Sequence, residues 1–364
     1  MLLEVTQVFD GHNDVLSALE RFGVDEAVQL FEFGCDTALD LVKAQRGGFA
    51  GGLFAVYVPD DRNPANLETL REATYHIPNP KPIHWTDALA RIKGQVALLL
   101  ELKSRGLLKL CLCSADIRQA MNSNRLAAVL HVEGADLIDP ELHVLELLYA
   151  AGMRSLGLVW NRPTIFAQGV PYSFPSSPNI GDGLSKLGRQ LVLRCNQLGI
   201  IVDLSHINEA GFWDVAEVTS HPLVASHSNS HAICPHARNL TDNQLRAIAS
   251  TNGIVGINFS VSFLRDDGRK LSDVPIDQVL RHFDHLLGIL GEDCIGLGSD
   301  YDGTITPREI ADVSTLPKLI NAMQKHGYGD ELVEKICRAN WLRVLKTTWE
   351  ECGSNQPTVE IRNE

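Results

Sequence analysis

The sequence lacks the features that would direct a protein to a membrane or to nucleic acid. No run of about 18 apolar residues is present, so no transmembrane helix is predicted. Asp and Glu number 45 against 32 Lys and Arg, and this net charge of −13 gives no general attraction for nucleic acid or anionic lipid. The first residues show no basic segment followed by an apolar run, so we expect no secretion signal and a cytoplasmic protein.

Paired cysteines and a dinucleotide-binding glycine pattern are also missing. The eight cysteines are scattered and none forms a Cys-x-x-Cys, which argues against zinc-finger and thioredoxin-type sites. No Gly-x-Gly-x-x-Gly follows the first apolar run, which weakens a nucleotide-binding interpretation. What is present is a chain of 364 residues, 45% hydrophobic and 21% charged, which can bury a large core.

Short apolar runs rich in β-branched residues recur along the chain, with helical patterns between them. Eight such runs occur, at residues 4–12, 51–58, 126–133, 154–161, 199–206, 222–228, 253–259 and 293–300. Continuous apolar runs are typical of parallel strands covered on both faces. Thr241 is a predicted N-cap for one of the intervening helices. The alternation predicts an α/β fold, a (β/α)8 TIM barrel, with an open doubly wound sheet as the alternative.

The chain shows no linker that would separate a second domain. We expect a single barrel domain over residues 1–350 and a polar C-terminal tail over 351–364. Two long connections, 59–85 and 161–183, are rich in Pro, Asn, Ser and Gly. Each follows a strand, so each is expected to overhang the active-site end of the barrel, either as a surface excursion or as a wall around the substrate.

Several of the predicted strands end in residues that bind metal ions or transfer protons. These are His12, Asp14, Glu133, His206, His227 and Asp300. A closed barrel gathers the carboxyl ends of its strands into one mouth, so we expect these side chains to lie close together. With Asp300 left aside for proton transfer, three histidines and two carboxylates remain; they are too many for one open zinc site and suit two Zn²⁺ ions that share a carboxylate.

Neighbouring polar residues have supporting roles in this interpretation. Asp300 is placed to handle a proton and Arg238 to bind a substrate carboxylate. Asp203 is expected to orient a ligand or to form a buried ion pair. Asp10 and His131 lie deeper along their strands and are expected behind the metals or in the core, whereas His231 and His236 are expected to face solvent.

At this point the sequence resembles the membrane or renal dipeptidase family, peptidase family M19. The resemblance is carried by "DGHND", "HVEGAD", "VDLSHIN", "ARNLTD", "GLGSDYDG" and "ANWLRVL", which occur in the family's order over residues 10 to 345. It implies that His12 and Asp14 bind one zinc ion, that His206 and His227 bind the other, and that Glu133 bridges them. It also implies that Arg238 holds the C-terminal carboxylate of a dipeptide and that Asp300 contacts the amine or donates a proton. A homodimer is a further expectation of the resemblance.

One position departs from the family pattern. Vertebrate-type members carry a histidine where this chain has Trp160, which offers an N–H donor and no protonatable nitrogen. In the family that histidine is associated with stabilising the tetrahedral intermediate. In its place, zinc alone, His131 or Asn161 could stabilise the oxyanion of that intermediate. The leading hypothesis is a zinc dipeptidase for short peptides, including L-Xaa-D-Xaa dipeptides. The alternatives are an amidohydrolase for N-acyl amino acids or other small amides and, least favoured, a barrel that binds a partner without catalysis.

Overall fold

The computed structural model describes residues 6–59 and 68–353. Within these ranges eight parallel strands follow one another around the sheet: β1 (Val8–Asn13), β2 (Phe49–Tyr57), β5 (Leu126–Glu133), β6 (Met153–Gly157), β8 (Ile201–Asp203), β9 (Val224–Ala225), β10 (Ile254–Ile257) and β11 (Ile295–Leu297). Their spatial order is their order in the sequence, whereas a doubly wound sheet reverses direction beside its first strand. The alternative open sheet is therefore excluded.

The ring closes between β1 and the segment that follows β11. The amide of Asp300 donates to the carbonyl of His12 at 3.0 Å, and the amide of Asp14 donates to the carbonyl of Tyr301 at 2.8 Å. These bonds join the first strand to the chain beyond the last one. The predicted (β/α)8 TIM barrel is confirmed.

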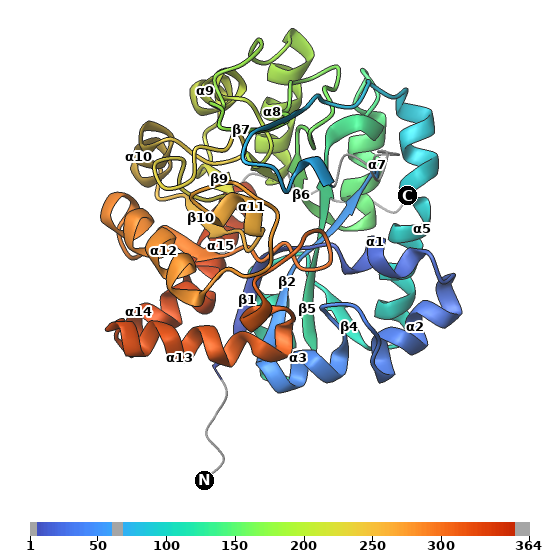
Figure 1. Cartoon of the computed structure of the whole chain (residues 1–364). Coiled ribbons are helices and arrows are strands. Elements are labelled where there is room, and N and C mark those ends of the chain that lie inside the picture. Colours follow the sequence, from blue (N-terminus) through green and yellow to red (C-terminus); the bar gives the residue numbers. More distant parts are fainter. Residues whose placement is uncertain (1–5, 60–67, 354–364) are drawn as a thin grey trace.

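Helices cover the outside of the strands (Figure 1). In the described ranges the α-helices are α1 (Val15–Glu20), α2 (Val24–Phe33), α3 (Leu41–Gly47), α5 (Trp85–Ser104), α6 (Ser114–Asn122), α7 (His143–Ala151), α8 (Lys186–Leu198), α9 (Glu209–Val218), α10 (Asp242–Ser250), α11 (Val261–Leu264), α12 (Ile276–Leu290), α13 (Leu316–His326), α14 (Asp330–Glu334) and α15 (Asn340–Gly353). Short 3₁₀ turns lie at η1 (Ala135–Leu137), η2 (Arg308–Ile310) and η3 (Val313–Thr315), and a π-helical segment, η4 (Lys335–Ala339), joins α14 to α15.

Local signals explain where two of these helices begin and end. Thr241 caps α10 as predicted: its hydroxyl accepts the amide of Gln244, whose side chain in turn accepts the Thr241 amide. The helical pattern at residues 15–30, in contrast, forms two helices. Gly23 lies between them with φ 76° and ψ 159°, a conformation open mainly to glycine that interrupts the helix.

The C-terminal helix α15 contributes a large side chain to the core between the strands. Trp341 is fully buried among Phe9 of β1, Leu53 of β2 and Val129 of β5, and its indole N–H donates to the carbonyl of Leu297 at 2.8 Å. Gly11 makes room for the ring, because a Cβ there would lie 2.3 Å from it. This packing explains the motif "ANWLRVL" near the end of the chain.

The two long connections meet above the barrel. β3 (Tyr75–Ile77) from the first pairs antiparallel with β7 (Tyr172–Phe174) from the second, which the sequence pattern did not predict. A further strand, β4 (Leu108–Leu110), pairs in parallel with the first three residues of β5. Residues 60–67 of the first connection and residues 354–364 of the predicted tail lie outside the described ranges. The predicted domain boundary at residue 350 falls within α15, which continues to Gly353.

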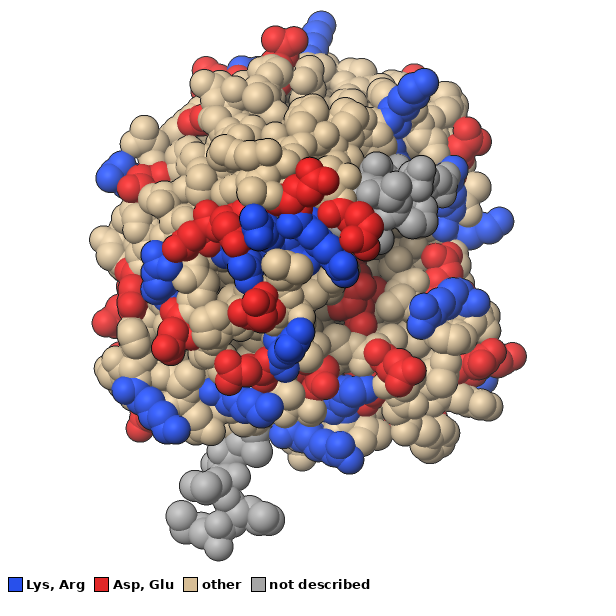
Figure 2. Space-filling view, viewed as in Figure 1, with Lys and Arg blue, Asp and Glu red and all other residues tan. Residues whose placement is uncertain are grey.

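The surface and the helices bear on possible partners. In the described residues no helix combines the length and the apolar character needed to cross a bilayer. On the face seen in Figure 2, Lys and Arg alternate with Asp and Glu instead of forming a continuous basic patch.

Candidate metal centre and active site

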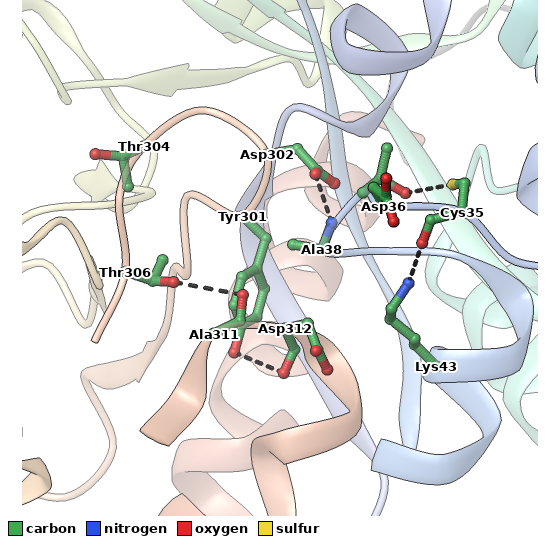
Figure 3. Close-up of a pocket in the computed structure, with 11 residues that line it drawn as sticks. Cys35, Asp36, Ala38, Lys43, Tyr301, Asp302, Thr304, Thr306, Ala311 and Asp312 are labelled. Atoms are coloured by element: carbon green, nitrogen blue, oxygen red, sulfur yellow. Dashed lines mark hydrogen bonds between the residues drawn. The ribbon is translucent and has the colours of Figure 1, made fainter. Parts of the chain in front are cut away.

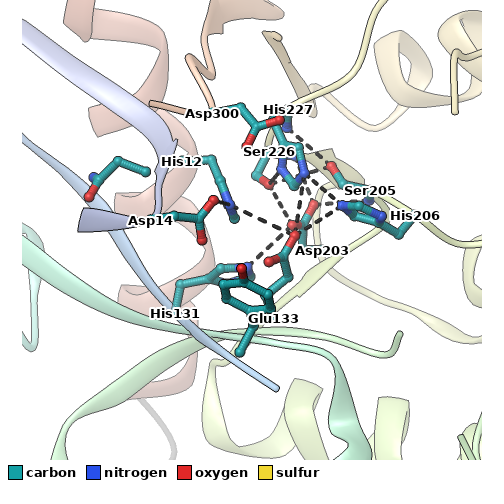
Figure 4. Close-up of polar contacts among 12 residues, drawn as sticks. His12, Asp14, His131, Glu133, Asp203, Ser205, His206, Ser226, His227 and Asp300 are labelled. Atoms are coloured by element: carbon teal, nitrogen blue, oxygen red, sulfur yellow. Dashed lines mark hydrogen bonds and ion pairs between the residues drawn. The ribbon is translucent and has the colours of Figure 1, made fainter. Parts of the chain in front are cut away.

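The predicted metal ligands lie together at the carboxyl ends of the barrel strands (Figure 4). His12 is in β1 and Asp14 follows that strand, Glu133 ends β5, and the other two histidines follow β8 and β9. All five are at most 5% exposed; they are His12, Asp14, Glu133, His206 and His227. Because the carboxyl ends of the strands meet at one end of the barrel, residues that are far apart in the sequence lie together there, as predicted.

The three imidazoles converge on one carboxylate oxygen. Oε1 of Glu133 lies 3.0 Å from Nε2 of His206, 3.5 Å from Nε2 of His227 and 3.8 Å from Nε2 of His12. Nε2 of His12 also lies 3.5 Å from Oδ2 of Asp14. Glu133 is therefore the shared centre of the cluster, and the ring of His227 lies between its neighbours, 3.9 Å from that of His12 and 5.0 Å from that of His206.

The donor atoms of this cluster fit divalent metal ions. Both ring nitrogens of His12 and Oδ1 of Asp14 are buried and have no hydrogen-bond partner among the described residues. Buried polar atoms are normally satisfied, so such orphans indicate a missing ligand. His12 also groups with Glu133 and His227, and separately with Asp14 and Asp300, at spacings suitable for a metal. Imidazole nitrogens and carboxylate oxygens are typical zinc ligands.

Burial and neighbouring charges shift the pKa values of the acidic groups and of His12 in this cluster. Burial raises the pKa of Glu133 well above its usual value, although the charge of His12 opposes this. Burial and the neighbouring Asp14 raise the pKa of Asp300 to about 7. Burial lowers the pKa of His12, but Glu133 and Asp14 outweigh it and bring the value to about 10. Without metal, protons must supply the positive charge that the carboxylates require.

Two residues of the site have left-handed backbones. His206 has φ 70° and Asp300 has φ 61°, conformations that cost energy for residues other than glycine. Such strain persists where the surrounding structure enforces it, and it concentrates at functional sites. Here the two positive-φ residues follow their strands, and both side chains line the pocket at the carboxyl end of the barrel.

A second set of polar residues lies behind the candidate ligands. Nδ1 of His206 lies 2.6 Å from Oδ1 of Asn161, which directs its Nε2 toward Glu133. Asp10 accepts the amide and the hydroxyl of Ser299 at 2.8 and 2.6 Å, and so ties β1 to β11. His131 is buried, 3.6 Å from Asp203. Asp10 and His131 thus lie below the cluster, as their strand positions predicted.

Arg238 lies beside the cluster as a buried cation. It is 3% exposed, its Nη2 donates to the carbonyl of His227 at 3.2 Å, and its Nε has no hydrogen-bond partner among the described residues. Its guanidinium lies over the ring of Phe263 at 5.3 Å. Burial lowers its pKa, although a guanidinium stays charged. The unsatisfied Nε is suited to an anionic partner.

The pocket above the cluster encloses about 390 Å³ of empty space, including its opening to solvent. Its lining combines predicted site residues with others that the sequence did not reveal: Asp14, Tyr57, Glu133, Trp160, Tyr172, His206, Phe263, Lys270, Asp300, Gly303 and Thr304. Trp160 lies here, 5.5 Å from Tyr57 and 6.2 Å from His206 between ring centroids. Asp300 accepts a hydrogen bond from the side chain of Asn258 at 3.0 Å.

Six lining residues were missed at the sequence level: Tyr57, Tyr172, Phe263, Lys270, Gly303 and Thr304. Tyr57 ends β2, so a search of the strand ends, which selected the candidate ligands, could have found it. Tyr172 belongs to the connection 161–183, which was expected to be either a surface excursion or a wall around the substrate; the structure shows that it contributes to the wall.

The prediction for His236 was wrong. It was expected to face solvent, but it is fully buried, 4.6 Å from Phe263 and 5.9 Å from Tyr75 between ring centroids. Burial lowers its pKa well below the usual value, so the ring is neutral at pH 7. The pairing of β3 with β7 places Tyr75 over it, and the sequence alone did not reveal that contact.

A larger pocket of about 890 Å³, open to solvent, adjoins the first one at Thr304 (Figure 3). Its charged groups hold the loop between α2 and α3. Asp302 accepts the amides of Ala38 and Leu39 at 2.6 and 3.2 Å, and Lys43 donates to the carbonyl of Cys35 at 2.5 Å. These bonds hold the loop between α2 and α3 in place as one wall of the larger pocket.

Comparison with known proteins agrees with this geometry. The profile of the family described as membrane dipeptidase (peptidase family M19) matches residues 1–357. A Klebsiella pneumoniae protein from the pqqA 5′ region is 48% identical over 259 residues, which are 71% of this chain and 96% of that protein.

Two solved structures are similar over almost the whole chain. A metallo peptidase of Rhodobacter sphaeroides, liganded with a phosphinate mimic of the dipeptide L-Ala-D-Ala, is 43% identical with a TM-score of 0.93, covering 95% of this chain and 100% of that one. The dipeptidase AC, a metallo peptidase of family M19, is 44% identical with a TM-score of 0.92, covering 95% and 99%. The chain therefore belongs to the membrane dipeptidase family, peptidase family M19, and is a metallodipeptidase of the (β/α)8 barrel type.

Proposed function

We propose that this metallodipeptidase is a two-zinc enzyme that hydrolyses dipeptides with a free amine and a free carboxylate, including L-Xaa-D-Xaa dipeptides. The observation that carries the proposal is the convergence of three imidazole Nε2 atoms on Oε1 of Glu133 within 3.8 Å. His12 and Asp14 would hold one ion, His206 and His227 the other, and Glu133 would bridge them. Zinc bound there would lower the pKa of a shared water and polarise the scissile carbonyl.

The residues around the cluster suit the two charged ends of a dipeptide. Arg238 offers a buried guanidinium with an unsatisfied Nε, which pairs well with a carboxylate. Asp300 lines the pocket above the cluster and would bind the free amine or pass a proton to it. The aromatic rings of Tyr57 and Trp160 lie 5.5 Å apart and give the pocket an apolar surface for the substrate.

The free amine distinguishes this proposal from hydrolysis of N-acyl amino acids. An acylated nitrogen is neutral, so it would leave the buried Asp300 facing a group that cannot neutralise its charge. Trp160 in place of the family histidine is the feature that keeps the second substrate class open. The L-D preference is supported by the L-Ala-D-Ala mimic bound to the Rhodobacter sphaeroides relative.

A substrate matrix tests the proposal. Purified protein, with zinc content measured on the same sample, is assayed on L-L and L-D dipeptides beside matched N-acyl amino acids. We expect two zinc ions per chain and turnover of dipeptides, with L-D members among the substrates. Preference for the acylated compounds would replace the dipeptide by an N-acyl substrate, and activity without any divalent ion would overturn the metal site.

We also propose a cytoplasmic location and a homodimer. Seven cysteines in the described residues are free thiols, which suits a reducing compartment. The dimer is an expectation of family membership. Light scattering on the purified chain, of mass 40.0 kDa, tests it directly.

A further inference from the structure

A chain of hydrogen bonds links the candidate ligand His227 to a buried carboxylate. Nδ1 of His227 lies 2.8 Å from Oγ of Ser226, and that hydroxyl donates to Oδ2 of Asp203 at 2.5 Å (Figure 4). All three side chains are buried. A hydroxyl has a single hydrogen, so once it points to Asp203 the serine oxygen accepts the N–H of Nδ1. Nε2, which faces Glu133, then carries a lone pair.

Asp203 and Ser226 are themselves held firmly. Oδ1 of Asp203 accepts the amides of Ser226 and Ser205 at 2.7 and 3.1 Å. The carbonyl of Ser226 packs against Gly256 and Gly298, where an added Cβ would lie 2.0 Å from it. The backbone at residue 226 therefore has little room to move, and this restricts the position of the adjacent residue His227.

The two neighbouring histidines have partners of different charge. Asn161, a neutral amide, orients His206. His227 is connected through Ser226 to the carboxylate of Asp203, which lies at the end of the adjacent strand β8. Carboxylates behind a metal-binding imidazole fix its tautomer and raise its basicity, and their loss typically weakens metal binding about 10- to 100-fold.

We propose that Ser226 and Asp203 are positioning residues that fix the tautomer and orientation of His227, and so set the affinity of the zinc ion that His227 would bind. This inference rests on the proposed function, because it takes His227 as a ligand. It adds two residues that neither touch the metal nor line the pocket.

The test compares Ser226→Ala and Asp203→Asn with the parent and with Ser155→Ala. Ser155 is a matched control, since its buried hydroxyl contacts the ring of His131 at 2.9 Å instead of His227. Metal-free proteins are titrated with zinc in competition with a chromogenic chelator. The visible spectrum of the cobalt(II)-loaded forms reports the ligand geometry, and thermal unfolding checks the fold.

We expect both variants to bind one zinc ion about 10- to 100-fold more weakly and to show an altered cobalt spectrum, with Ser155→Ala unchanged. If Ser226→Ala does not fold, Asp203→Asn decides. Equal weakening in Ser155→Ala would overturn the inference, because general loosening would then explain the effect.

His227→Ala separates the inference from the proposed function. Parent-like zinc affinity in Ser226→Ala and Asp203→Asn, with one ion lost in His227→Ala, overturns the positioning role and leaves the metal site intact. Parent-like binding in His227→Ala itself overturns the proposed ligand set, and the positioning role with it.

Discussion

The Nε2 atoms of His206 and His227 lie 2.9 Å apart, and both face Oε1 of Glu133. Neighbouring strands β8 and β9 deliver them to this point. Two imidazole lone pairs this close repel each other unless a proton or a cation lies between them. Burial, and next the charge of His12, lower the pKa of His227 well below its usual value. His227 is therefore a neutral donor at pH 7, as a zinc ligand must be.

Replacement of Glu133 by Gln should abolish the shared centre while preserving volume. The amide cannot bridge two cations as a carboxylate does, so we expect fewer than two zinc ions per chain. We also expect kcat/KM for dipeptides to fall at least about 100-fold, since metal assistance contributes several kcal/mol. Zinc analysis and steady-state kinetics measure both effects.

The metal-free form provides the control for this variant. Burial raises the pKa of Glu133, so the charged carboxylate is destabilising there in the absence of metal. Metal-free Glu133→Gln should accordingly unfold at the same or a higher temperature than the metal-free parent. Full dipeptide hydrolysis by the variant would contradict the bridging role.

Gly303→Ala should disturb the site through a steric effect. A Cβ at Gly303 would lie 1.9 Å from Oδ2 of Asp14 and 2.5 Å from Oδ1 of Asp300. We expect Asp14 to be displaced, with loss of one zinc ion and a drop in activity of roughly tenfold or more, by analogy with small misplacements of reacting groups.

Gly329→Ala is its matched control. An added Cβ there meets nothing within 4 Å, and φ is −69°, which any residue adopts. Zinc content and activity should match the parent. Equal zinc content in both glycine variants would show that Asp14 is not a ligand, or that it moves without consequence.

Arg238→Met should reveal which end of the substrate the guanidinium recognises. For L-Ala-D-Ala we expect kcat/KM to fall roughly 100- to 1000-fold, the scale of losing one partner of a buried charge pair. The C-terminal amide of the same dipeptide has no carboxylate. We expect the parent to hydrolyse it with a smaller kcat/KM, and Arg238→Met to change that value little. An equal loss for both substrates would assign Arg238 to structural support, through its bond to the carbonyl of His227.

Features of this site that depend on neighbouring residues in the sequence could be predicted, whereas features that depend on contacts between distant segments could not. The barrel and the clustering of the candidate ligands could be predicted, because runs of buried strand and the residues at their ends are local features. The aromatic wall could not, since Tyr172 reaches the pocket through the pairing of β7 with β3, a contact between distant segments. The burial of His236 was missed for the same reason. The break at Gly23 depends on a backbone angle that hydrophobic periodicity does not specify.

A buried histidine outside the active site should make stability depend on pH. Nδ1 of His282 accepts the amide of Ser230 at 3.2 Å, and Nε2 donates to the carbonyl of Leu264 at 3.0 Å, an arrangement that requires the neutral ring. Burial lowers the pKa of His282 from 6.5 to about 4, although the Leu264 carbonyl opposes this. Between these two values the unfolded chain binds a proton that the folded chain does not, so stability falls as the pH falls.

The contribution of His282 should cost about 2 kcal/mol between pH 7 and pH 5, and about 3 kcal/mol by pH 4. His282→Asn keeps an acceptor for the Ser230 amide but has no titratable group. We expect this variant to be less stable than the parent at pH 7, because the bond to Leu264 is lost, and to lose less stability on acidification. Urea unfolding of metal-free protein at pH 7, 6 and 5 measures the difference between the two slopes. Parallel slopes would mean that His282 accepts a proton without unfolding, and that its buried hydrogen bonds rearrange to allow it.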